Sequence, residues 1–192
     1  MMRATLMILG AMILLGAAQG ALAHRMTIGQ ISPDFLIAAT AAIGLLLGPT
    51  AGTLAGILAG LAHGSIAGVG LGSFMASRAL VGCLAGSAKS HVFHGNPIVP
   101  LVGGAVGTLV AESVFVLLNP PARLGEWFAP LPLIAIYNGI IAVPTYWALR
   151  RLLCEGFLTT KTRRLITETW KFGSTEGNAG CLVLQLSLST LN

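Results

Sequence analysis

Charged residues are scarce in this sequence of 192 residues: Asp, Glu, Lys and Arg make up 9% of it, whereas 55% of the residues are hydrophobic. A soluble domain usually carries about a quarter charged residues, so this chain could not cover a water-facing surface. The composition therefore excludes an ordinary soluble protein. It predicts an integral membrane protein, with lipid around most of the chain.

Catalytic and metal-binding patterns are also lacking. The cysteines Cys83, Cys154 and Cys181 lie far apart and match no metal-binding spacing. The sequence holds no carboxylate pair, no metal-ligand cluster and no phosphate-binding loop with its lysine. Ala62-His63 faintly resembles the histidine helix of intramembrane serine proteases, but no Gly-x-Ser-Gly nucleophile accompanies it. We therefore expect no enzyme activity, no metal and no cofactor.

Long apolar runs dominate what is present. Crossing a bilayer takes about 20 apolar residues in a helix, and six runs are candidates. They cover residues 5–23, 33–47, 51–66, 72–86, 97–118 and 130–149. The fold class that follows is an all-α membrane protein, a bundle of six transmembrane helices. The first run also has the form of a signal peptide. An uncleaved first helix is the preferred interpretation, since further spans follow directly.

The basic residues give a net charge of +5 and predict an orientation. They lie beside apolar segments rather than in one patch, which indicates the positive-inside rule and not a nucleic-acid surface. Two bases fall in predicted outside loops, Arg25 and Arg123. Eight fall on the predicted inside: Arg3, Lys89, Arg150, Arg151, Lys161, Arg163, Arg164 and Lys171. Both termini are therefore expected in the cytoplasm.

The composition divides the chain into two parts. Residues 1–152 form the predicted transmembrane domain, and residues 153–192 form a predicted cytoplasmic tail. Residues 159–172 place apolar side chains on one side and bases elsewhere, which is compatible with a short amphipathic surface helix. A loosely ordered tail is an equally good interpretation.

Glycine forms the most regular pattern in the sequence. Seven glycines recur at every fourth position: Gly48, Gly52, Gly56, Gly60, Gly64, Gly68 and Gly72. On a helix this spacing makes a smooth face, which a neighbouring backbone can approach closely. We expect this glycine ladder to be a packing surface within the bundle, with contact to a partner as the alternative. Gly103 and Gly107 repeat the spacing in the fifth run.

Two ionisable residues lie inside predicted spans, where a charge is costly. At a rise of about 1.5 Å per residue, both Arg78 and Glu112 lie about 9 Å below the outer surface. Opposite charges at equal depth on consecutive helices predict an ion pair between them. Asn138 and His63 are expected in the same outer half, with His63 as a hydrogen-bonded histidine near a helix end.

Asp34 lies at the start of the second run, directly after Ser32 and Pro33. Ser as the N-cap, Pro in the first turn and Asp beside it would satisfy free N–H groups and complement the helix dipole. Capping is a sufficient explanation for this carboxylate, so a catalytic role for Asp34 is not expected.

Several short motifs resemble the MreD family of rod-shape-determining membrane proteins. They are ISPDFL at residues 31–36, GLLLGP at 44–49, AGTLAG at 51–56, LVG at 80–82, AG at 85–86 before a basic loop, Glu112, and YNG at 137–139. The resemblance covers about residues 5–152. It implies a fold related to the substrate-binding subunits of energy-coupling-factor transporters. It also implies that Asp34, Arg78, Glu112 and Asn138 shape the fold or a partner surface.

The resemblance further implies a non-catalytic role in the bacterial inner membrane, supporting lateral peptidoglycan synthesis. The expected partners are lipid and the membrane proteins of the cell-elongation complex: MreC, the MreB filament, RodA and a transpeptidase. The alternative is a substrate-binding subunit of a vitamin or metal transporter. The related fold and the small residues Ala17 and Ala21 favour that alternative, and the low aromatic content of 6% speaks against a ligand cavity.

Overall fold

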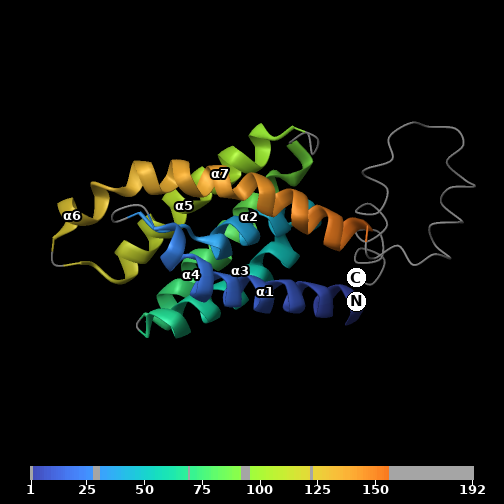
Figure 1. Cartoon of the computed structure of the whole chain (residues 1–192), viewed down its shortest axis with the longest axis horizontal. Helices are drawn as coiled ribbons and strands as arrows, with labels where there is room; N and C mark the ends of the chain where they lie inside the picture. The colour runs from blue at the N-terminus through green and yellow to red at the C-terminus, as the bar shows by residue number, and fades with distance from the viewer. Residues whose placement is uncertain (1, 28–30, 69, 92–95, 122, 156–192) are drawn as a thin grey trace, which may run out of the picture.

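The computed structural model describes residues 2–27, 31–68, 70–91, 96–121 and 123–155, and within these ranges the regular structure is helical (Figure 1). The six long helices are α1 (Met2–Leu22), α2 (Phe35–Leu47), α3 (Pro49–Ala67), α4 (Leu71–Ser87), α5 (Ile98–Leu118) and α7 (Leu131–Arg150). The five-residue helix α6 (Leu124–Phe128) lies between α5 and α7. Short helical turns follow at His24–Met26, Ala88–His91 and Arg151–Glu155.

The six long helices occupy the six predicted runs, and no boundary differs by more than three residues (5 against 2 at the start of α1). The tail from residue 156 onward, including the predicted amphipathic stretch, lies outside the described residues. The start of α1 and the end of α7 lie at the same end of the bundle (Figure 1). This arrangement agrees with an even number of crossings. Which side of the membrane that end faces stays a prediction.

Four helices are long and apolar enough to cross a membrane: α3, α4, α5 and α7. The protein is therefore a membrane protein. The apolar stretches of α1 (Ile8–Leu22) and α2 (Phe35–Leu47) are shorter. At about 1.5 Å per residue, α2 is about 20 Å long, against about 30 Å for the hydrocarbon layer.

The short helix α2 forms the centre of the bundle. Twelve of its thirteen residues, from Leu36 to Leu47, are buried, and α2 contacts α1, α3, α4, α5 and α7. It is apolar on every side, as expected of a helix surrounded by protein. Protein rather than lipid encloses α2, so its length need not match the bilayer.

The glycine ladder packs α3 against α4. A methyl group added at Gly52 or Gly56 would overlap the backbone carbonyl of Gly82 or of Arg78, respectively. At Gly60 it would overlap the backbone of Met75. The two helices therefore meet backbone to backbone, and the predicted packing surface lies within the bundle.

The ladder does not run along one helix. Gly48 and Gly68 lie at the two ends of α3 with positive φ angles of 102° and 70°, a conformation that favours glycine. Gly64 packs on Leu71, whereas Gly72 belongs to α4 and has open space around it. The spacing of four residues therefore continues past both ends of α3. Gly48 and Gly68 allow the turns at these ends, and the glycines between them make the close contact with α4.

Candidate functional site

Asp34 begins α2 and is the centre of a buried polar cluster. Its Oδ1 accepts hydrogen bonds from the backbone N–H groups of Leu36 and Ile37, both at 3.0 Å. Asp34 is therefore the N-cap of α2, where the sequence predicted Ser32 in that position. Capping occupies only Oδ1, so Oδ2 is left to interact with other helices.

Arg78 of α4 supplies the partner for that second oxygen. Its Nη2 lies 2.7 Å from Asp34 Oδ2, and its side chain is 1% exposed. This distance is typical of a charge-assisted hydrogen bond. The predicted ion pair between Arg78 and Glu112 is wrong: among the described residues, the carboxylate that pairs with Arg78 is Asp34. The predicted depth of a residue along its helix does not fix the direction in which its side chain points.

His63 of α3 joins the same pair. Its Nδ1 lies 2.9 Å from Arg78 Nη2 and 3.2 Å from Asp34 Oδ2. The prediction of a hydrogen-bonded histidine near a helix end is confirmed, since α3 ends four residues later at Ala67. We call Asp34, His63 and Arg78 the charged triad.

Neutral amides tie the start of α2 to three further helices. The N–H of Asp34 donates to Asn138 Oδ1 of α7 at 2.9 Å, and Asn138 Nδ2 donates to Thr108 Oγ1 of α5 at 3.1 Å. Gln19 of α1 donates to the carbonyl of Pro33 at 2.9 Å and accepts from the N–H of Phe35 at 2.8 Å. All six long helices therefore meet at the start of α2. Asn138 lies with the triad, as its predicted depth suggested.

Aromatic rings extend from the triad toward α6. His63 stacks on Phe74 with a centroid distance of 4.6 Å, Phe74 lies 4.4 Å from Phe115, and Phe115 lies 5.8 Å from Trp127. The Arg78 guanidinium lies over the Phe74 ring at 4.7 Å, within the range of a cation–π contact. This row of rings packs beside the triad on the side of α6.

Glu112 of α5 lies near the triad without pairing to it. Its carboxylate interacts electrostatically with Arg78, Asp34 and His63, and it also interacts with the Trp127 side chain. Arg78 Nε is buried without a hydrogen-bond partner in the described structure. The cluster thus contains two carboxylates, one guanidinium and one imidazole.

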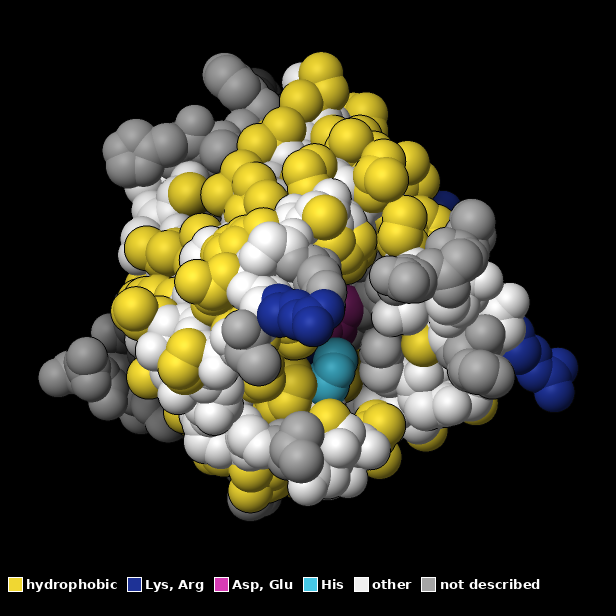
Figure 2. Space-filling model, turned by 90° about the vertical axis from the view of Figure 1, so that its left-hand side faces the viewer, with side chains coloured by type: hydrophobic (Ala, Val, Ile, Leu, Met, Phe, Trp, Pro, Cys, Tyr) yellow, Lys and Arg dark blue, Asp and Glu magenta, His cyan; other side chains and the backbone are white. Residues whose placement is uncertain are grey.

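The triad is close to the surface at the end of the bundle that carries α6. His63 is 24% exposed, whereas Arg78 is almost fully enclosed. Figure 2 views this end and shows a histidine side chain in a hollow, with an acidic side chain beside it and a Lys or Arg side chain in front. The imidazole is therefore the member of the triad with the most exposed surface.

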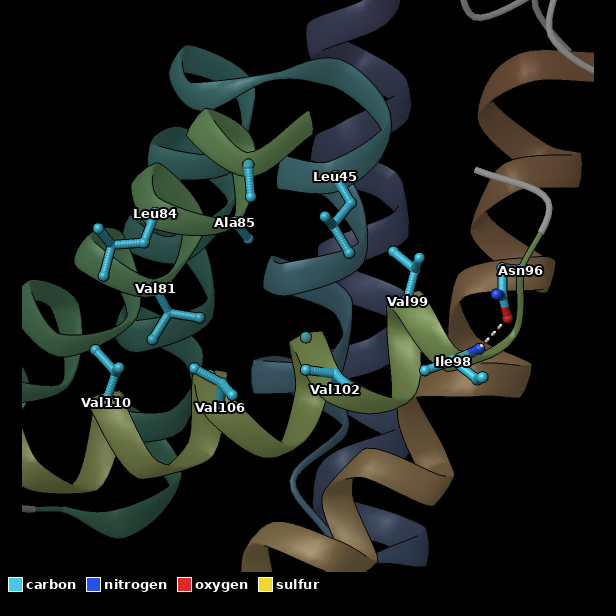
Figure 3. A pocket seen from close by; sticks show the side chains of 13 residues that line it. Leu45, Val81, Leu84, Ala85, Asn96, Ile98, Val99, Val102, Val106 and Val110 are labelled. Carbon is cyan, nitrogen blue, oxygen red and sulfur yellow. Dashed lines mark hydrogen bonds between the residues drawn. The ribbon is translucent and has the colours of Figure 1, made fainter. Parts of the chain in front are cut away.

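A second feature is an apolar groove between α4 and α5, with a volume of about 390 Å³. Figure 3 shows the valines of α5 on one side of it, α4 on the other, and Leu45 of α2 at its floor. The valines are Val99, Val102, Val106 and Val110. We call this feature the valine groove. The lining is apolar except for Asn96 at one end.

Sequence reasoning missed three parts of the triad's surroundings: Gln19, Thr108 and the aromatic row. Gln19 carried a usable signal, because it is a lone amide in a long apolar run. Thr108 and the rings carried none, since Thr and Phe are ordinary residues in membrane helices. Within the described residues, no three His, Cys, Asp or Glu side chains gather in a geometry that could hold a metal ion.

A comparison of the chain with protein-family models, with curated proteins and with solved structures finds no match in any of the three.

Proposed function

We propose that this chain is a non-catalytic component of the bacterial cell-elongation complex, which supports lateral peptidoglycan synthesis through helix–helix contacts in the inner membrane. The proposal rests on the resemblance of residues 31–36, 44–49 and 51–56 to the MreD family. The structural observation that carries it is the valine groove, because a membrane protein that acts by contact needs a surface that its own helices leave open.

The valine groove suits a transmembrane helix of a partner. Its two walls repeat at helical spacing: Val81, Leu84 and Ala85 lie on α4, Ala88 follows directly after it, and the four valines lie on α5. Lipid tails are as apolar as a helix side chain, so helices associate in a membrane through close packing rather than hydrophobicity. A groove between two helices offers that packing to a third helix with a ridge of Leu, Ile or Val. We propose that the occupant is the membrane-spanning helix of a protein such as MreC.

Cross-linking in the native membrane tests this proposal. A photoreactive residue at Val106, which is 51% exposed in the groove, should yield an adduct of defined mass with one membrane protein. The same residue at Ile136 of α7, which is 59% exposed away from the groove, is the matched control. Mass spectrometry of the adduct should identify a protein of the elongation complex. Adducts with lipid alone at Val106, or equal adducts at both positions, would refute the groove as the contact.

A second candidate function, a substrate-binding subunit of a transporter, is favoured by one observation. The His63 side chain is 24% exposed beside Asp34 and Arg78, so a small polar molecule could contact it. Native mass spectrometry of the purified protein tests this candidate. A retained small molecule that is lost in His63→Ala would support it, and ligand-free protein from cells grown in rich medium would count against it.

A further inference from the structure

The imidazole of His63 has one ring nitrogen between two groups with opposite hydrogen-bonding demands. Nδ1 lies 2.9 Å from Arg78 Nη2, which can only donate, and 3.2 Å from Asp34 Oδ2, which as a carboxylate can only accept. A single nitrogen cannot satisfy both. The identity of its partner therefore depends on whether Nδ1 carries a proton.

In neutral His63 with an unprotonated Nδ1, the lone pair accepts a hydrogen bond from Arg78. Arg78 then bridges Asp34 and His63 through the same Nη2. When Nδ1 takes a proton from water, the lone pair is used, and the Arg78–His63 hydrogen bond is lost. The new N–H points to Asp34 Oδ2, which then receives both cations. One proton thus exchanges a contact between α3 and α4 for a contact between α3 and α2.

The charges around His63 allow this exchange. Three charged groups interact with His63 in the described structure: Asp34 on α2, Arg78 on α4 and Glu112 on α5. The groups that α1 and α7 bring to the cluster are the neutral amides Gln19 and Asn138. A Lys or Arg side chain also lies in front of the hollow (Figure 2), so charges of both signs surround the imidazole.

We propose that His63 is a proton-binding site, loaded from the water at the α6 end of the bundle, and that its proton selects between Arg78 and Asp34 as its partner. Two further observations support this assignment. The imidazole is partly exposed while its two partners are buried, so protons reach it first. Imidazole is also the side chain that ordinarily changes charge between about pH 5 and 8. The proposal does not depend on the role of the valine groove.

Nitrogen NMR of the full chain in lipid nanodiscs tests the site. The chain has four histidines, so His24, His91 and His94 are replaced by Gln to leave His63 alone. At high pH the spectrum should show the neutral form with an unprotonated Nδ1, and both nitrogens should become protonated as the pH falls. A neutral form with the proton on Nδ1, or no change between about pH 5 and 9, would overturn the proposal.

A second measurement uses His63→Asn. The Asn amide places one polar atom where Nδ1 lies in His63, and that atom does not change its protonation with pH. The thermal midpoint of the single-histidine protein should change with pH across the range in which its NMR signals change. The midpoint of the same protein with His63→Asn should be flat there. If both midpoints follow pH alike, or neither does, proton binding at His63 does not select between the partners.

Discussion

Helix α4 has two faces that differ in how they meet their neighbours. Toward α3, the backbones are in contact, because Gly52, Gly56 and Gly60 remove the side chains between them. Toward α5, the valine groove keeps the two helices apart over part of their length. One helix is thus fixed firmly on one side and left open on the other.

The difference shows how a small helix bundle can bury the charged side chain of Arg78 and still leave the valine groove open to a partner. The close contact with α3 brings Arg78 within reach of Asp34 and His63, where a longer side chain at Gly56 would block the approach. The open side carries only apolar residues, which cost nothing when they face lipid. Helix α4 therefore packs tightly on the side of α3 and leaves an open groove on the side of α5.

The largest expected effect comes from disrupting the close contact between α3 and α4. Gly56→Leu would drive a branched side chain into the backbone at Arg78. Overpacking usually costs about 1–3 kcal/mol, and a backbone clash that no rotamer relieves costs more. We expect little folded protein in the membrane, measured as yield and as monodisperse protein in detergent. Gly72→Leu in α4 is the control, because Gly72 has open space around it. Equal yield from both variants would show that α3 and α4 do not meet through glycine.

The next largest effect is expected from removing one member of the buried ion pair between Arg78 and Asp34. Arg78→Gln or Asp34→Asn alone should each lower the free energy of unfolding by about 3–5 kcal/mol, because each leaves a buried charge unpaired. The double variant should recover part of that loss, which a double-mutant cycle measures.

The same cycle with Glu112→Gln in place of Asp34→Asn is the control for the pairing. Its coupling with Arg78→Gln should be the weaker one, because Glu112 lies near Arg78 without forming an ion pair. Additive effects for Arg78 with Asp34, together with strong coupling to Glu112, would contradict the observed geometry.

A smaller effect is expected where the cluster is held by neutral groups. Asn138→Leu removes the acceptor for the buried N–H of Asp34, which should cost about 1–3 kcal/mol. Tyr137→Phe is the neighbouring control, because its hydroxyl donates to the carbonyl of Met26 at an exposed position. Thermal unfolding in detergent should rank Asn138→Leu clearly below Tyr137→Phe. The reverse order would mean that the Asn138 contact adds little.

The helices could be predicted from the sequence because their signals are local. Apolar runs mark the helices, and Gly and Pro mark some of their ends, as at Gly48-Pro49 between α2 and α3. The short α6 was not predicted, since five residues give no periodicity. That Asn138 lies near Arg78 and Glu112 could be expected from the helical rise, which places all three at a similar level of the bundle.

The pairing within the cluster could not be predicted in the same way. Asp34 and Arg78 are 44 residues apart, and nothing in either segment marks the other. Helix capping explains the role of Asp34 Oδ1, but it gives no indication that Oδ2 pairs with Arg78. The choice between Asp34 and Glu112 depends on how α2 and α5 are rotated about their axes. That rotation is set by packing against several helices at once.

The central position of α2 has a consequence for synthesis of the chain. Asp34 leaves the ribosome 44 residues before Arg78 and 104 residues before Asn138. At about 5–20 residues per second, its charge waits about 2–9 seconds for a counterion. During that interval only α1 and α3 are available to cover α2, and the contacts with α4, α5 and α7 are still missing. A chain that stops before α4 can never bury that group. A truncated product of this kind lacks the guanidinium that pairs with Asp34 and the amide that accepts its N–H.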